Sequence, residues 1–470
     1  MVKLRVLSVV ALAGLAASAA AFGRVDFGVW RDLQLRTSSH LLFGVQKPLK
    51  ESSTESVDAA TAEGDPRTLA TVARGLHVHV VTSSPDAGAN LDMIALWPDD
   101  VHPTHLIVCN ETDDTSLPGV QRIRIADGSV ETILSGTVDC DPVRRTPWGT
   151  IIVGEEVGPP TPGHILEIIH PLDTTGVQFD RESGALTGTD AGNVTTRPAV
   201  GRLAFEGIAV YANGLMYYGD ENRPNKGTPG GAYFKFIPTT PWGGGQITDL
   251  SQSPLASGTV YGLRLGKRNN DTDYGHGSNT GLGVWVPISP SNDADLRAAS
   301  AAAKLTGYYR PEDIDIDRAA EAEGNVRFCG NNTGNEDQDH QWGETICVTD
   351  GSLGAATANT ATPQVQYLVI GTPELAMMDN MAYQPGRGNW ILHEDGAGPD
   401  VGRNNDLWSC LDDGKDDDSL SDGCVRVATL NDLTAEWTGG IFDASGRTLY
   451  VSVQHNVTGH GVILKITGWK

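Results

Sequence analysis

Apolar and polar side chains alternate with a period of two through most of the chain, which predicts β-strands rather than helices. Clear examples are the segments GLHVHVVT at 75–82, NLDMIALWP at 90–98 and THLIVCNE at 104–111. The segment VQRIRIADGSVETIL at 120–134 predicts a β-hairpin, because Asp-Gly between two alternating runs is a strong turn signal. Similar segments recur as far as GVILKITGW at 461–469.

One sizeable helix is expected in the second half of the chain, at residues 292–304 (NDADLRAASAAAK), with an Asn or Asp as its N-cap. The loops between the predicted strands are rich in glycine and proline, of which the chain has 56 and 25. Many short strands joined by such loops favour a sandwich, a barrel or a propeller, and a length of 470 residues favours the propeller. The pattern therefore predicts an all-β fold, although no repeat of fixed length marks individual blades.

The N-terminus is typical of a secretory signal peptide at residues 1–21. Lys3 and Arg5 precede an apolar run at 6–15, and small residues follow up to Ala21. The run is too short for a membrane-spanning helix, which needs about 20 apolar residues. We therefore expect a periplasmic or secreted protein, with a lead-in segment at 22–74 and a propeller domain at 75–470.

The charge balance is strongly acidic, with 59 acidic and 34 basic residues and a formal net charge of −25. Such a surface repels nucleic acid and anionic membranes, so neither is expected as a partner, and we expect a monomer. The excess of carboxylates indicates either bound divalent cations or the acidic surface of an exported protein.

Six cysteines in an exported chain favour disulfides. Cys329 and Cys347 flank one predicted loop, and Cys410 and Cys424 flank another, so each pair is expected to be bridged. Cys109 and Cys140 remain, and the residues alone leave three alternatives open: a third disulfide, two buried thiols, or a thiolate ligand for a metal.

Acidic and amide residues follow several predicted strands at the point where each strand ends. These candidate ligands are Asn110, Glu111, Glu156, Glu221, Glu394 and Asp395. In a propeller the innermost strands line the central channel, so oxygen ligands from several blades can meet at one end of it. His455 lies in a predicted strand, where a hydrogen-bonded core histidine is the alternative interpretation.

The segment YYRPEDIDID at 308–317 places charge beside isoleucine. Alternation puts Arg310 and Glu312 on the same face as Ile314 and Ile316. Because an unpaired charge on a buried face costs several kcal/mol, roughly, this pair must either satisfy itself or line a wet, charged site.

Four segments, in this order, resemble the PhoX family of bacterial alkaline phosphatases: RRTPWGTIIVGEE, GRLAFEGIAV…GLMYYGDENRP, YYRPEDIDID and EWTGGIFDASGRTLYVSVQHN. The resemblance runs from about Gly75 to the C-terminus. It implies a six-bladed β-propeller with long loop insertions, in which a cluster of ferric iron and calcium at the channel mouth hydrolyses phosphomonoesters.

The resemblance also assigns roles to residues. Arg310 corresponds to a phosphate-binding arginine, and Glu312 and Glu206 correspond to metal ligands. Cys140 corresponds to a cysteine that ligates iron, so it is expected to stay free of disulfides. Glu156 and Glu221 are expected to complete the calcium and iron ligands.

The chain departs from the family pattern at several positions. It has no twin-arginine export signal, Phe205 stands where a histidine is usual, residues 454–456 read QHN rather than QHP, and DPVRR at 141–145 replaces a glycine-rich stretch. These departures indicate a divergent branch, exported as an unfolded chain that acquires its metals outside.

Two other functions fit the same acidic strand ends. One is a calcium-dependent propeller that cleaves lactones or phosphotriesters. The other is a calcium-stabilised extracellular binding module without enzymatic activity. Iron found with calcium in the purified protein would favour the phosphatase.

Overall fold

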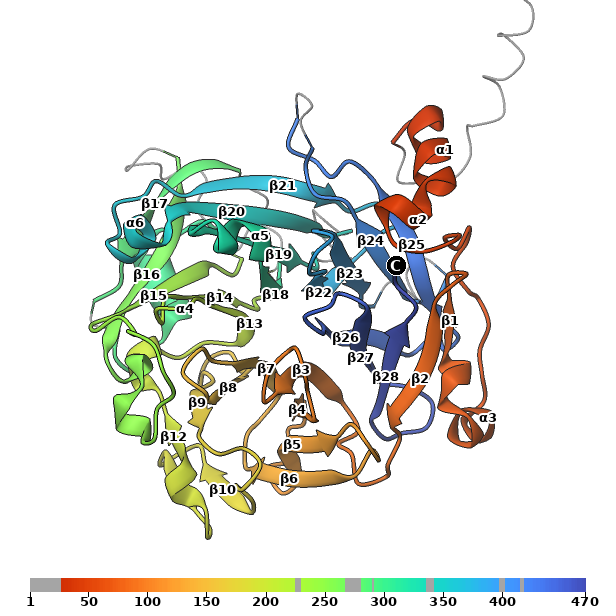
Figure 1. The fold of residues 1–470 in the computed structure, drawn as a ribbon. Coiled ribbons are helices and arrows are strands. Elements are labelled where there is room, and N and C mark those ends of the chain that lie inside the picture. Colours follow the sequence, from red (N-terminus) through yellow and green to blue (C-terminus); the bar gives the residue numbers. More distant parts are fainter. Residues whose placement is uncertain are drawn as a thin grey trace, which may run out of the picture.

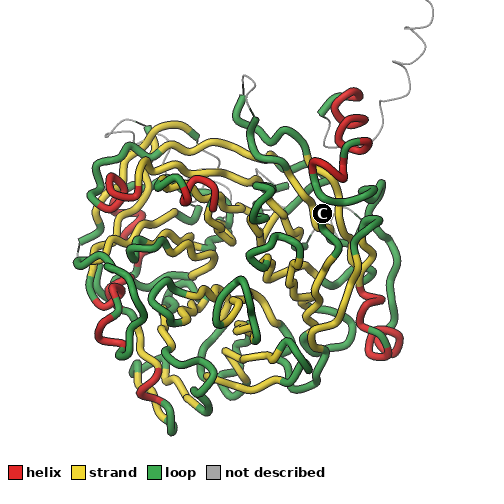
Figure 2. The backbone as a smooth tube through the Cα atoms, in the orientation of Figure 1, coloured by secondary structure: helices red, strands yellow, loops and turns green. Residues whose placement is uncertain are grey.

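The computed structural model describes residues 27–224, 230–266, 280–289, 291–334, 342–396, 402–414 and 418–470, so the expected signal peptide lies outside the described residues. The sheets are arranged around a common centre in an all-β, propeller-like fold (Figure 1). Strands make up most of the ring, and most of the helices lie on its outside (Figure 2). Among the described residues, no helix has the length and apolar character needed to cross a membrane.

The described strands form five hydrogen-bonded sheets. Three of them are β11(Ala185–Thr187), β10(Val177–Asp180), β6(Val130–Ser135), β5(Pro118–Arg124), β4(His105–Asn110) and β3(Leu91–Trp97); then β12(Val194–Thr196), β9(Ile165–Ile168), β8(Ile151–Glu155) and β7(Cys140–Arg145); and β2(His77–Thr82), β28(Val462–Thr467), β27(Thr448–Gln454) and β26(Glu436–Phe442). The predicted hairpin at 120–134 is confirmed as β5 and β6, with Ile123 opposite Val130.

The other two sheets are larger or extended by the N-terminal segment. One is β1(Ala70–Val72), β25(Cys424–Leu430), β24(Asp406–Cys410), β23(Trp390–Glu394) and β22(Met378–Tyr383). The other has nine strands: β13(Phe205–Val210), β14(Met216–Asp220), β15(Tyr233–Pro238), β16(Gly258–Leu265), β17(Gly281–Pro287), β21(Gln364–Ile370), β20(Glu344–Ser352), β19(Asn325–Asn332) and β18(Pro311–Ile316).

The strands nearest the centre contact one another in a closed ring. Their order is β3, β7, β13, β18, β22 and β26, and β26 contacts β3 again (Figure 1). The expected count of six blades is nevertheless not confirmed, because β17 pairs with β21 at Gly281–Val365 and joins two groups of strands into the nine-stranded sheet.

The N-terminal part of the chain closes the ring onto the C-terminal part. β2 pairs antiparallel with β28, with His77 opposite Thr467, and β1 pairs with β25, with Ala70 opposite Leu430. The last sheet therefore takes strands from both ends of the described chain, as Figure 1 shows by the contact of orange and dark blue strands.

The described α-helices are short. They are α1(Val29–Thr37), α2(Ser39–Leu42), α3(Ala59–Gly64), α4(Leu296–Ala303), α5(Arg318–Ala322) and α6(Leu353–Thr357). Of these, α3 to α6 each begin with a side-chain N-cap. The helix predicted at 292–304 is confirmed as α4, and the Asp295 carboxylate accepts a hydrogen bond from the Ala298 N–H as its N-cap. Inner strands such as β13 and β14 are buried at every position, because sheets pack against both of their faces.

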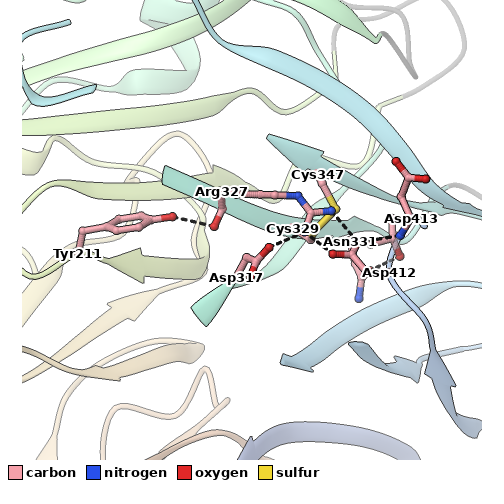
Figure 3. The surroundings of a disulfide bond; sticks show 9 residues. Tyr211, Asp317, Arg327, Cys329, Asn331, Cys347, Asp412 and Asp413 are labelled. Carbon is pink, nitrogen blue, oxygen red and sulfur yellow. Dashed lines mark hydrogen bonds and ion pairs between the residues drawn. A yellow bond between two sulfur atoms is a disulfide. The ribbon is translucent and has the colours of Figure 1, made fainter. Parts of the chain in front are cut away.

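All six cysteines form disulfides. The predicted bridges Cys329–Cys347 and Cys410–Cys424 are confirmed, and each joins two residues that are opposite each other in paired strands. Figure 3 shows the first bridge beside Arg327, whose guanidinium donates hydrogen bonds to Asp317 and Asp412.

The expectation that Cys140 stays free to bind iron is wrong. Its Sγ is bonded to that of Cys109, and both side chains are fully buried in one core cluster. The physical reason is the contact between β4 and β7, which brings the two Cα atoms to 5.1 Å. Of the three alternatives that the residues alone left open for Cys109 and Cys140, the third disulfide is the one that forms.

The segment at 308–317 departs from simple alternation. The register of β18 shifts between Pro311 and Ile314, so two residues of β18 lie in an irregular stretch opposite β19. Both Glu312 and Asp313 are buried, as expected for an innermost strand with both faces covered. Arg310 precedes the strand with φ 57, a left-handed backbone that is uncommon outside glycine.

Candidate metal centre

The start of each innermost strand and the end of the strand paired with it lie at the same end of the ring, because each pair is antiparallel. Leu91 is opposite Asn110, Cys140 is opposite Glu155, and Met378 is opposite Glu394. Phe205 and Asp220 are paired in the same way. Within each blade, the residue that follows one member of such a pair therefore lies beside the residue that follows the other member.

Acidic side chains gather at this end of the ring in four overlapping groups of three. The groups are Asp92, Glu111 and Asp141; Asp141, Glu156 and Glu206; Glu206, Glu312 and Asp379; and Asp379, Asp395 and Glu436. Within each group, ligand oxygens lie within 4.8 Å of one another. Three residues are shared, so the groups contain nine carboxylates, which we name the acidic cluster.

Burial changes the protonation of the cluster. Burial raises the pKa of six members well above their ordinary values, and in each of them neighbouring carboxylates raise it further. These six members are Asp92, Glu111, Glu156, Glu206, Asp379 and Glu436. Burial also raises the pKa of Glu312 to about 8, although Arg310 lowers it, and that of Asp141 to about 6. So many like charges are therefore unfavourable together unless protons or cations compensate them.

Several of these carboxylates have an oxygen that accepts no hydrogen bond among the described residues. These oxygens are Asp92 Oδ1, Asp141 Oδ1, Glu312 Oε1 and Asp379 Oδ1. Asp92, Asp141 and Glu312 are at most 4% exposed. Glu312 Oε1 has an ion-pair partner in Arg310 Nη2. Because buried polar atoms are normally hydrogen-bonded, the oxygens of Asp92, Asp141 and Asp379 indicate a place for a cation.

Arg310 brings a guanidinium to the rim of the acidic cluster. Its Nε donates to Glu221 Oε1 at 2.7 Å, and its Nη2 lies 3.3 Å from Glu312 Oε1. The same Nη2 is 4.0 Å from Asp395. The side chain is 17% exposed, so solvent reaches it. Among the described residues, the ion pairs that reach the cluster come from Arg310 and from His455, whose Nε2 lies 3.1 Å from Glu436.

The predicted site residues divide into three sets. Glu111, Glu156, Glu206, Glu312 and Asp395 belong to the acidic cluster. Arg310, Glu221 and His455 lie beside it, as their ion pairs show. Asn110, Glu394 and Cys140 are outside it.

The residues outside the cluster are occupied within the blades. Asn110 Nδ2 donates to the carbonyl of Pro118, and its Oδ1 accepts from the Asn90 N–H. Glu394 is fully buried and is bound by Arg403. Neither side chain contributes an oxygen to the four groups.

Sequence reasoning missed four members of the cluster: Asp92, Asp141, Asp379 and Glu436. Each is the first or second residue of an innermost strand, at β3, β7, β22 and β26. The signal that could have found them is a single acid at the start of an apolar run, repeated once per blade.

The donor set of the cluster consists of oxygen atoms. Clustered carboxylates with unpartnered oxygens suit hard cations such as Ca²⁺, which takes six to eight oxygen ligands. An iron site with a cysteine ligand does not fit, because Cys140 is in a disulfide and no described cysteine is free. The acidic groups could thus hold metal ions, and the residues favour oxygen-ligated ones.

Comparison with known families decides the relationship. The sequence profile described as alkaline phosphatase PhoX matches residues 109–456, well over half of the chain. The chain belongs to the PhoX family. The resemblance of the four segments is thereby confirmed, and the cluster residues from Asp141 to Glu436 lie within the PhoX match. No curated protein matches the sequence.

Three solved structures that resemble this PhoX-family chain differ in how similar they are. PhoX from Pseudomonas fluorescens, in complex with vanadate, has a TM-score of 0.60 and 14% identity over 88% of this chain and 98% of that one. Aldose sugar dehydrogenase from Streptomyces coelicolor has a TM-score of 0.43 and 11% identity, covering 83% and 98%. A gluconolactonase from Xanthomonas campestris has a TM-score of 0.42 and 12% identity, covering 89% and 96%. The first likeness shows the shared propeller-like fold.

Proposed function

We propose that this protein hydrolyses phosphomonoesters at a centre in which the acidic cluster binds divalent cations. The observation that carries the proposal is the gathering of nine carboxylates, with unpartnered oxygens, beside one guanidinium. Membership of a family of alkaline phosphatases supports the reaction. The related PhoX structure contains vanadate, described there as a transition-state analogue.

The carboxylates would hold the cations in neighbouring positions, because each of the four groups shares a residue with the next. Cations bound there would neutralise the charge of the phosphate group and stabilise the leaving oxygen. Glu312 and Glu206 keep the roles expected of them as ligands. Asp92, Asp141, Asp379 and Glu436 are added to the ligand set.

Arg310 is proposed to bind the phosphate group of the substrate. Glu221 and Glu312 orient the guanidinium through Nε and Nη2, and among the described residues Nη1 makes no hydrogen bond. A planar guanidinium held in this way can donate to a non-bridging phosphate oxygen. The charge pair in the segment at 308–317 thus both satisfies itself and serves a charged site.

We propose Ca²⁺ as the cation, because oxygen donors form the cluster and the expected thiolate is absent from it. We also propose export to the periplasm or beyond. Three disulfides support export, since they persist in oxidising compartments. A small phosphate ester as substrate and a monomeric state complete the proposal.

We further propose that the nine-stranded sheet consists of two blades, which gives six in total. One blade would be β13 to β17 and the other β18 to β21. This division is supported by the ring of six innermost strands, in which β13 and β18 occupy separate places.

The decisive experiment measures cation content and hydrolysis together. The purified protein should contain calcium, hydrolyse a generic aryl phosphate, lose that activity in excess chelator, and regain it when Ca²⁺ is restored. Chelation should also lower the melting temperature, because it leaves like charges packed without compensation.

Two outcomes would contradict the proposal in different ways. A melting curve unchanged by the chelator would show that the carboxylates bind no cation. A protein that is fully loaded with calcium and inert toward every phosphomonoester tested would point to the extracellular binding module instead.

A further inference from the structure

We propose that the Cys109–Cys140 disulfide is a positioning element of the cation centre. It would hold Glu111 and Asp141 at the separation at which they, together with Asp92, bind one divalent cation. This inference rests on the proposed function, and it concerns a bond that replaces the free cysteine expected from the family. The argument begins with the position of the bond between sheets.

The disulfide joins two sheets that share no strand pairing. Cys109 is in β4, whose sheet also contains β3, whereas Cys140 is the first residue of β7 in the neighbouring four-stranded sheet. The described strands of these two sheets are not linked by a β-ladder. The disulfide is therefore a covalent connection at a boundary where side chains pack and a few hydrogen bonds form, among them Asp139 N–H to the Thr112 carbonyl and Arg145 Nε to the Leu96 carbonyl.

The first acidic group spans the same boundary. Asp92 comes from β3 and Glu111 follows β4, while Asp141 comes from β7. Cys109 is two residues before Glu111, and Cys140 immediately precedes Asp141. The bond thus ties together the two backbone segments that carry ligands of one group.

The group has the features of a built site. Asp92 and Asp141 are 4% and 2% exposed, and one oxygen of each accepts no hydrogen bond among the described residues. Glu111 is held in place by Gln454, whose Nε2 donates to Glu111 Oε2 at 2.6 Å. Three like charges repel one another, so a site of this kind needs a rigid frame to keep the oxygens together before the cation binds.

The other two disulfides have a different setting and provide matched controls. Cys329–Cys347 and Cys410–Cys424 each join residues that are already opposite each other in hydrogen-bonded strands. Their strands, β19, β20, β24 and β25, contribute no residue to the acidic cluster. Losing one of them should lower stability without changing the ligands of a cation.

The test compares two double variants, Cys109→Ala/Cys140→Ala and Cys329→Ala/Cys347→Ala. Calcium content per chain and Ca²⁺ affinity by titration calorimetry are measured for both, together with melting temperatures with and without Ca²⁺. We expect the first variant to lose one bound Ca²⁺ or to bind it at least about tenfold more weakly, which corresponds to about 1.4 kcal/mol. The control should keep the wild-type stoichiometry and affinity.

A double-mutant cycle separates positioning from general destabilisation. In an Asp141→Asn background the first group is already impaired, so removing the Cys109–Cys140 bond should reduce Ca²⁺ affinity little further. If the alanine pair folds poorly, Cys109→Val/Cys140→Ala restores side-chain volume at the buried site and is tested in the same way.

The outcomes distinguish this inference from the proposed function. Wild-type protein that binds no Ca²⁺ would overturn both. Wild-type protein that binds Ca²⁺, with equal affinity and stoichiometry after loss of the Cys109–Cys140 bond, would overturn the positioning role and leave the proposed function standing. Equal losses in both cysteine variants would overturn it as well, since the effect would then be general.

Discussion

Consecutive acids at the ends of β8, β14 and β23 have very different surroundings. The first acid of each pair is bound by an arginine: Glu155 by Arg181, Asp220 by Arg297, and Glu394 by Arg403. The second acid lies at the centre of the ring: Glu156 and Asp395 in the acidic cluster, and Glu221 beside Arg310. Because neighbouring side chains in a strand point to opposite faces, one acid enters the blade and the next faces the centre.

Glu394 illustrates the acids inside the blades. Besides Arg403, it accepts hydrogen bonds from the backbone N–H groups of Ala376 and Asp406 and from the indole of Trp408. Both of its oxygens are therefore satisfied by the protein itself. Such a network offsets the free-energy cost of burying a charge.

Asp92 and Asp141 illustrate the acids at the centre. They are as well buried as Glu394, but each keeps an unpartnered oxygen among the described residues. The comparison teaches that the chain compensates a buried acid with its own arginine where the acid supports a blade. At the centre Arg310 is paired with Glu221 and Glu312, and under the proposed function cations from the solution compensate the remaining acids.

The largest expected effect comes from removing an arginine that binds a buried acid inside a blade. Arg403→Met removes the guanidinium that contacts Glu394 and Asp406, so the buried Glu394 loses its ion-pair partner, whereas Asp406 keeps Arg426. We expect the free energy of unfolding to fall by about 3–5 kcal/mol, measured by chemical denaturation, with bound calcium unchanged. Arg67→Met is the control, because its ion pair with Asp65 is exposed and should contribute little to stability. A loss of calcium in Arg403→Met would contradict the distinction between acids bound inside the blades and acids at the centre of the ring.

Arg310→Lys tests the centre through the substrate. Lysine keeps the charge but loses the planar fork, so hydrolysis of an aryl phosphate should fall by about one to three orders of magnitude while calcium content stays at the wild-type level.

Glu312→Gln removes an anionic ligand and should lower calcium content and activity together. If both variants instead unfold alike and keep their calcium, Arg310 and Glu312 are merely a buried ion pair.

The pH dependence of stability separates proton compensation from cation compensation. Burial raises the pKa of Glu312 from an ordinary value of 4.5 to about 8, so between these values the folded state holds more protons than the unfolded state. In excess chelator the melting temperature should therefore fall as the pH rises through this window. Excess Ca²⁺ should reduce that fall, and parallel curves with and without Ca²⁺ would contradict cation binding.

The smallest effect is expected from Glu206→Gln. Glu206 is shared by two of the acidic groups, and its neighbours Asp141 and Glu312 raise its pKa in addition to burial. Glutamine avoids the cost of burying this acid among other acids, so the calcium-free protein should become more stable by about 1 kcal/mol. The same change should destabilise the calcium-loaded protein, and melting temperatures in the two states give the comparison.

Much of the fold could be predicted from the sequence, because strands, turns and helix caps are local. The hairpin at 120–134, the helix α4 and the two disulfides between paired strands all follow from short-range pattern. The Cys109–Cys140 bond was left open among the alternatives, since it depends on two blades meeting. The six-blade count is likewise a matter of how distant strands pair.

The candidate site could be predicted in part. Glu156 and Glu206 were found because they end or begin a conspicuous strand, but Glu394 was included although it faces into its blade. Asp92 and Asp379 were missed, since a single acid in an apolar run resembles ordinary alternation. Whether an acid faces the centre depends on whether it occupies an odd or an even position along its strand. It also depends on the register shifts near the starts of the innermost strands.

The closure of the ring by β2 and β28 determines when the centre can form during folding. His77 pairs with Thr467, and β26, which carries Glu436, contacts β3, which carries Asp92. These contacts join segments that are far apart in the sequence, so they form only after both segments have been synthesised. Contacts of such long sequence separation make folding slow, because a large loop must close first. We therefore expect the acidic cluster to be completed late in folding, after β2 and β28 have paired.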